Sequence, residues 1–224
     1  MRSRATLVTM LAGALLVSAC ESRDRAQAVE APDLQRAGPT MSMPSVQDSF
    51  AQSLKYETDK QYAAAEEIIR PLADGGDEYA QLRLAWLAYQ SGDYKLSAAR
   101  YQRLVERRPT MVDARLGFTL PLMAQLRWRE AAAQAQAVLA VHPGQYMAHI
   151  RLLACEEALK QWDVADSHAR ELAALYPSDA DVLILAARAK AGRRDAAEAR
   201  QAYMNVLSRS PSNQEAQIYL KAHP

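Results

Sequence analysis

The residues that could do chemistry in this chain are few, and their spacing does not bring them together. A zinc site needs three or four converging ligands, and no such spacing joins the histidines, which are His142, His149, His168 and His223. Glu156 and Glu157 are adjacent, so on a helix they point in different directions. Cys155 is expected to be a small buried residue rather than a reactive thiol. We therefore predict no catalytic residue, no metal site, no cofactor and no enzymatic activity.

Composition excludes further classes of function. The chain has 224 residues, half of them hydrophobic, and a formal net charge of +1. A nucleic-acid-binding protein would carry a strongly basic face, so we expect no nucleic-acid partner, and no motif indicates a small-molecule substrate. The two cysteines, Cys20 and Cys155, do not form the pattern of a disulfide framework. We expect no disulfide.

The first twenty residues have the layout of an export signal. Arg2 and Arg4 precede an apolar run over residues 5–17, which is too short for a comfortable membrane span. The run ends in Val17-Ser18-Ala19-Cys20, which resembles the lipobox of bacterial lipoproteins. The resemblance implies that residues 1–19 are removed and that Cys20 is acylated, for example with palmitate. The alternative is an ordinary signal cleaved after Ala19, with Cys20 incidental.

The next segment, residues 20–45, is interpreted as the lipidated cysteine followed by a flexible tether. It has no apolar periodicity and contains Pro32, Pro39 and Pro44. Glu21 follows the cysteine, where enterobacterial lipoproteins retained in the inner membrane carry aspartate. By analogy, we expect the mature protein to be an outer-membrane lipoprotein that faces the periplasm.

The rest of the chain, residues 46–224, is organised by a 34-residue period. Four prolines stand at this interval, Pro109, Pro143, Pro177 and Pro211. Eleven or twelve positions before each proline stands a small residue, in turn Ser97 with Ala98, then Ala131, Ala165 and Ala199. Fifteen positions before it stands an aromatic residue in three of four cases, Tyr94, Trp128 and Trp162. Repeats of this length indicate an array of stacked helix pairs.

The period and these residues resemble the tetratricopeptide family, whose pattern is W-x2-L-G-x2-Y, then A-x3-F, then P. The first aromatic of that pattern is absent, and its places hold Gln81, Arg115, His149 and Leu183. The resemblance implies an all-α solenoid of about five helix-turn-helix repeats, the first of them degenerate over residues 46–77. A C-terminal capping helix is expected over residues 213–221, turns at residues 91–93 and 191–193, and burial of the three aromatic residues.

In tetratricopeptide proteins the first helix of each repeat lines the binding surface, chiefly with positions 2, 5, 9 and 12. The apolar residues at these positions are our candidate partner-binding residues: Tyr79, Leu82, Trp86, Tyr89, Leu116, Leu120, Met123, Met147 and Ile150. Exposed aromatic residues and methionines are typical of protein interfaces. Two alternatives remain open, because aromatic residues at helical spacing also form cores and because the first repeat could cover part of this surface. Arg83 and Arg151 stand where chaperone-binding relatives hold a carboxylate, but the other residues of that clamp are missing.

The order of signal, lipobox, tether and repeats resembles the TadD-like lipoproteins of the tight-adherence (Flp) pilus and, more loosely, the pilotins of type IV pili. The resemblance implies a non-catalytic, lipid-anchored periplasmic scaffold that helps to assemble a pilus or secretion system, with a secretin or another component of that machine as protein partner. The alternative is an adaptor that docks an envelope protease or a peptidoglycan hydrolase.

Overall fold

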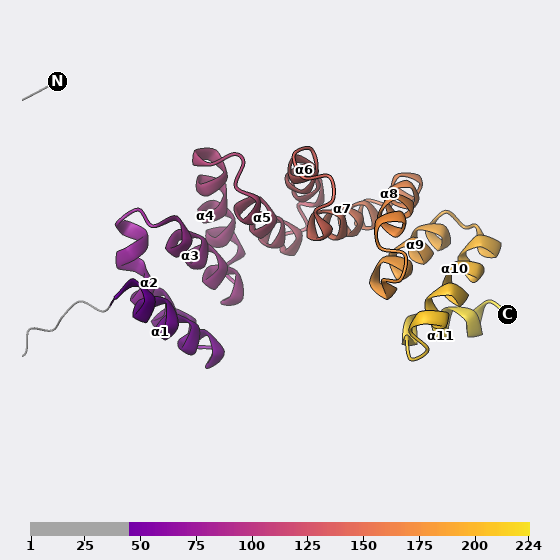
Figure 1. Ribbon diagram of the computed structural model, residues 1–224, viewed down its shortest axis with the longest axis horizontal. Coiled ribbons are helices and arrows are strands. Elements are labelled where there is room, and N and C mark those ends of the chain that lie inside the picture. Colours follow the sequence, from indigo (N-terminus) through magenta and orange to yellow (C-terminus); the bar gives the residue numbers. More distant parts are fainter. Residues whose placement is uncertain (1–44) are drawn as a thin grey trace, which may run out of the picture. The chain divides into compact units, whose positions relative to one another are not determined.

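The computed structural model describes residues 45–224 (Figure 1). Every regular element in this range is a helix. The helices are α1 (Val46–Thr58), α2 (Tyr62–Asp74), α3 (Glu78–Gln90), α4 (Tyr94–Arg107), α5 (Val112–Ala124), α6 (Trp128–Leu139), α7 (Tyr146–Ala158), α8 (Trp162–Leu175), α9 (Ala180–Gly192), α10 (Ala196–Arg209) and α11 (Gln214–Ala222). The signal segment, Cys20 and nearly all of the expected tether lie outside the described residues.

Consecutive helices pack against one another along the whole array, from α1 on α2 to α10 on α11. The helices form five pairs, each a repeat, and α11 remains as a single helix after the last pair. The all-helical repeat fold and the terminal cap predicted from the 34-residue period are therefore confirmed. No helix among the described residues is longer than 14 residues, and such short helices are stable chiefly through packing on their neighbours.

The turn inside each pair repeats one backbone conformation. A residue with positive φ stands between the two helices of every repeat: Lys60, Gly92, Leu126, Lys160 and Arg194. Glycine adopts this left-handed conformation without strain, but only the second repeat has glycine there. The turn expected around Gly192 was misplaced by two residues, since Gly192 ends α9 and Arg194, with φ of 62°, makes the turn.

The small residues of the repeat lie at the crossing of its two helices. Ser97, Ala131, Ala165 and Ala199 are all 0% exposed. Ser97 donates a hydrogen bond from Oγ to the carbonyl oxygen of Ala85, at 2.8 Å, so its hydroxyl group is satisfied within the crossing. Because these positions are fully buried, a larger side chain there would overpack the crossing.

The expected burial of the three repeated aromatic residues was only partly right. Tyr94 is 37% exposed, and Trp128 and Trp162 are half-buried. The indole of Trp162 lies against Gly192 of the next repeat, where an added Cβ atom would come within 2.2 Å of ring atom Cδ2. Gly192 is therefore a packing residue, because any side chain there would collide with the ring.

Candidate functional site

The candidate partner-binding residues lie on three helices that touch in sequence. Tyr79, Leu82, Trp86 and Tyr89 belong to α3, Leu116, Leu120 and Met123 to α5, and Met147 and Ile150 to α7. Because α3 contacts α5 and α5 contacts α7, the residues form neighbouring rows. Their spacing of three or four positions along each helix places them on one side of it. We call this set of nine residues the first-helix face.

Exposure varies across the first-helix face. Tyr79 and Met147 are exposed, at 69% and 39%, and the other seven residues are half-buried. Leu82 and Met123 pack partly on the central core cluster, and Ile150 packs on the C-terminal one. None of the nine is fully buried, so the face is neither pure core nor pure surface.

The first repeat covers part of the face at its α3 end. The indole Nε1 of Trp86 donates a hydrogen bond to Glu57 of α1, at 2.5 Å. Glu57 also forms an ion pair of 2.8 Å with Arg83 of α3. Burial alone would raise the pKa of Glu57, but the hydrogen bonds from Trp86 and Arg83 lower it below its usual value. The sequence left open whether the first repeat covers part of this surface. It does so at Trp86, because α1 holds the indole in place.

Tyr89 continues the aromatic part of the face. Its ring centroid lies 5.6 Å from that of Trp86 and 5.5 Å from that of Tyr94. Distances and tilted geometries of this kind are favourable for aromatic pairs. Tyr94 belongs to α4, so Tyr89 links the face to the second helix of its own repeat.

Ion pairs lie at the other end of the first-helix face. Arg188 of α9 donates from Nε to Glu215 of α11 at 2.8 Å, and its guanidinium lies 3.8 Å from Glu157 of α7. The neighbouring Glu215 raises the pKa of Arg188, which stays charged, and burial raises the pKa of Glu157. The apolar rows of α3, α5 and α7 therefore lie between two groups of paired charges.

Arg151 of α7 is a charge within this apolar region. It is half-buried, and burial lowers the pKa of its guanidinium, although Tyr89 and Cys155 act on that pKa in the opposite direction. Among residues 45–224 it has no carboxylate in ion-pair contact, unlike Arg83 and Arg188. A half-buried cation without a counter-charge is costly. The sequence indicated Arg151 only as part of an incomplete carboxylate clamp. That it lacks a carboxylate partner depends on the neighbouring helices, so only the structure shows it.

His149, His168 and Cys155 make ordinary packing and hydrogen-bonding contacts. Within residues 45–224, no three His, Cys, Asp or Glu side chains gather closely enough to hold a metal ion. His149 contacts the carbonyl oxygen of Pro143, and His168 contacts Glu156. Cys155 is a free, fully buried cysteine, and burial raises the pKa of its thiol to about 11. None of the helices in this part of the chain combines the length and the apolar character needed to cross a membrane.

The paired helices and their repeated crossings give this protein the fold of a tetratricopeptide-repeat solenoid. The tetratricopeptide repeat family matches residues 79–110, which hold α3 and α4. No curated protein matches the sequence significantly.

Solved structures share the same architecture at low sequence identity. MamA from Desulfovibrio magneticus RS-1 superposes with a TM-score of 0.68 at 15% identity, over 77% of this chain and 99% of its own. A tetratricopeptide repeat protein from Parabacteroides merdae gives 0.70 at 10% identity, over 79% and 71%. A thermophilic tetratricopeptide protein from Thermus thermophilus gives 0.59 at 16% identity, over 79% and 97%. At these identities the likeness concerns the fold alone.

Proposed function

We propose that this protein is a non-catalytic scaffold that binds a protein partner through the first-helix face. One observation carries the proposal: three touching helices present apolar side chains that remain partly exposed, with Tyr79 and Met147 the most accessible. Large aromatic residues and methionine provide contact area and adapt to the shape of a partner. The flanking ion pairs limit the apolar region to α3, α5 and α7.

Arg151 indicates the chemistry of the segment that would bind. A partner that covers the face removes more water from this guanidinium, so it must supply a compensating group. The best group is a carboxylate, which pairs with arginine through two parallel hydrogen bonds. The proposed partner segment is therefore mainly apolar, with one acidic group opposite Arg151.

The cellular setting is also a proposal. The lipobox-like sequence ending in Cys20 supports a lipid anchor, and Glu21 supports the outer membrane, with the repeats facing the periplasm. The layout resembles TadD-like and pilotin-like lipoproteins, which supports a role in assembly of a pilus or secretion system with a secretin as a candidate partner. An adaptor for an envelope protease or peptidoglycan hydrolase would use the same face.

Affinity capture from detergent-solubilised envelopes tests the proposal. The bait is the full chain, compared with a Tyr79→Ala/Met147→Ala variant. A matched control, Leu175→Ala/Met204→Ala, truncates residues that are 56% and 46% exposed on α8 and α10. We expect the parent and the control to capture the same partner and the Tyr79→Ala/Met147→Ala variant to lose it. The free energies of unfolding of the three proteins should agree within about 0.5 kcal/mol.

Two outcomes would contradict the proposal. Full capture by the Tyr79→Ala/Met147→Ala variant would place the interface elsewhere. Loss of capture by the control as well would show that exposed apolar residues act without regard to position. The identity of a captured partner, a secretin or a hydrolase, separates the two cellular roles.

A further inference from the structure

A second surface lies on other helices, outside the first-helix face. A cleft of about 620 Å³ runs between α2 and α4 over the start of α3. Its volume is in the range of ligand-binding clefts in proteins. None of the nine residues of the first-helix face lines it.

The floor of the cleft is apolar. Leu84 of α3 and Leu104 of α4 are nearly buried, at 8% and 2% exposed, and contribute their outer atoms. Leu96 of α4 lies at the rim and is 39% exposed. An apolar side chain placed here would cover Leu96 and gain contact with the floor.

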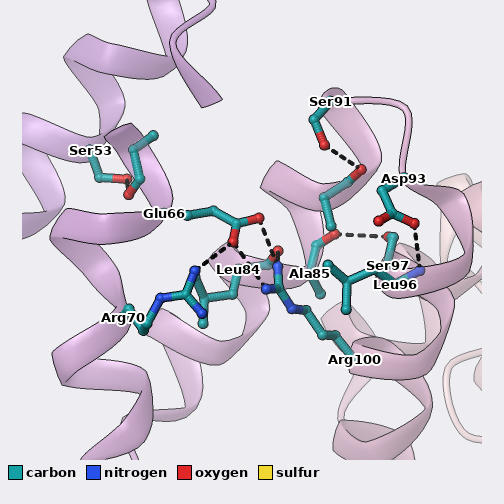
Figure 2. Close-up of polar contacts among 12 residues, drawn as sticks. Ser53, Glu66, Arg70, Leu84, Ala85, Ser91, Asp93, Leu96, Ser97 and Arg100 are labelled. Carbon is teal, nitrogen blue, oxygen red and sulfur yellow. Dashed lines mark hydrogen bonds and ion pairs between the residues drawn. The ribbon is translucent and has the colours of Figure 1, made fainter. Parts of the chain in front are cut away.

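Two arginines of the cleft are held by one glutamate (Figure 2). Glu66 of α2 accepts hydrogen bonds from both terminal nitrogens of Arg100, at 2.8 and 3.0 Å, and from Arg70 at 3.1 Å. Arg100 also donates to the carbonyl oxygen of Leu84 at 2.6 Å. These contacts join α2, α3 and α4 and neutralise part of the positive charge on this side of the cleft.

Two further arginines on the α4 wall are not neutralised in this way. Arg103 and Arg107 stand one helical turn apart and are exposed. Arg107 contacts the uncharged side chain of Gln81. Neither arginine forms an ion pair with a carboxylate of residues 45–224. Like charges at this spacing repel each other on a helix.

The carboxylates of the cleft do not balance these charges. Asp74 and Glu106 line it, and Glu106 accepts a hydrogen bond from Gln102 instead of an arginine. With Glu66, three carboxylates stand against four arginines. These seven side chains carry a net charge of +1, and Arg103 and Arg107 are the two arginines among them that form no ion pair with a carboxylate of residues 45–224.

Among the four repeats of residues 78–211, only the first has arginine at both of these α4 positions. One period later, the positions of Arg103 and Arg107 hold Ala137 and Val141. In the following two repeats they hold Glu171 with Leu175 and Asn205 with Arg209. The paired arginines are therefore not required by the repeat fold.

We propose that the cleft between α2 and α4 binds an acidic amphipathic segment of a partner protein. Two of its carboxylates, one helical turn or about 6 Å apart, pair with Arg103 and Arg107. Its apolar side chains cover Leu96 and the floor of the cleft. This site is additional to the first-helix face and involves different helices.

Binding of synthetic peptides to the full chain tests this proposal. The probe is a fluorescent amphipathic peptide of about 15 residues with two glutamates four positions apart, and its control carries glutamine at both. The protein variant is Arg103→Gln/Arg107→Gln. Its matched control is Arg129→Gln/Arg209→Gln, which removes the same charge from exposed positions of α6 and α10.

We expect the glutamate peptide to bind the parent protein and the Arg129→Gln/Arg209→Gln control protein with equal affinity. Two exposed charge pairs are lost in the Arg103→Gln/Arg107→Gln variant, so its affinity should fall roughly two- to thirtyfold. The glutamine peptide should show a similar loss on the parent. Raising salt from about 50 to 500 mM should weaken binding to the parent, since exposed charges are screened.

Several results would overturn the proposal. They are equal binding of the two peptides, undiminished binding to the Arg103→Gln/Arg107→Gln variant, and no binding up to about 1 mM at low salt. Displacement of the peptide by inorganic phosphate at similar concentration would show a general anion site and would overturn the assignment to a protein segment. Loss of peptide binding in Tyr79→Ala/Met147→Ala, with Arg103→Gln/Arg107→Gln unaffected, would transfer the site to the first-helix face.

Discussion

The contact between Tyr101 and Gly117 gives a sharp test of how neighbouring repeats fit together. Tyr101 of α4 is 3% exposed. Its ring lies directly on Gly117 of α5, where an added Cβ atom would come within 2.3 Å of ring atom Cε1. One and two periods later the same pair of positions holds Ala135 with Arg151 and Ala169 with Leu185. In these three pairs a large residue on one helix accompanies a smaller one on the other, whereas three periods later Tyr203 and Tyr219 are both large and stack with ring centroids 4.1 Å apart.

The predicted perturbation is Gly117→Ala. Inside a helix this change normally stabilises by about 1 kcal/mol, because alanine loses less backbone entropy. Here the new methyl group must displace a buried ring, and overpacking of this kind costs about 1 to 3 kcal/mol or more. We therefore expect a net loss of stability of up to about 2 kcal/mol. Tyr101→Ala should cost about 3 to 5 kcal/mol, because it leaves a cavity.

A compensating variant separates this reasoning from general sensitivity of the site. Tyr101→Ala/Gly117→Leu reproduces the pair found at Ala169 and Leu185, so it should recover at least about 2 kcal/mol of the loss in Tyr101→Ala. Urea unfolding of the full chain, followed by circular dichroism, measures all four proteins. If Gly117→Ala raises the midpoint of the parent, or if Gly117→Leu lowers that of the Tyr101→Ala background, the packing argument is wrong.

Four further predictions concern single positions. Leu126 has φ of 59° and is 70% exposed, so Leu126→Gly should raise stability by about 1 kcal/mol in a thermal melt; an unchanged or lower midpoint would contradict this. Burial would raise the pKa of Asp166, but its hydrogen bond from Lys190 and the charges of Arg170 and Arg193 hold that pKa below its usual value. Because the folded-state pKa lies below the unfolded one, Asp166 stabilises fully above about pH 4, and this contribution is lost as pH falls through the folded-state pKa. Asp166→Asn should then lower the free energy of unfolding by about 2 to 4 kcal/mol at pH 7. In urea unfolding at about pH 3 the difference between parent and variant should be smaller. A difference that is the same at both pH values would refute the lowered pKa of Asp166. Arg151→Met should keep or raise the melting temperature and weaken partner capture, and unchanged capture would remove Arg151 from the site. Cys20→Ala should abolish labelling by a palmitate analogue, and label that persists would exclude acylation at Cys20.

The repeat architecture follows from local sequence. The prolines mark the ends of the repeats, and small residues such as Ala131 and Ala165 mark the helix crossings. These signals depend on backbone geometry and on side-chain size at one position, so each helix can be recognised from its own residues and those one period away. The nine residues of the first-helix face were chosen from the positions that line the binding surface in tetratricopeptide proteins, and helical spacing places them on one side of each helix.

The tertiary structure decides which of those residues remain exposed. Trp86 is tied to Glu57, which lies 29 residues earlier in the chain, while Arg151 is left without a carboxylate among the described residues. The cleft beside Arg103 exists because α2 and α4 both pack on α3. Exposure, ion pairing and cavities depend on how helices far apart in the sequence meet. A periodic pattern describes each helix by itself. It therefore does not predict which positions a side chain from a neighbouring repeat will cover, or which charges it will neutralise.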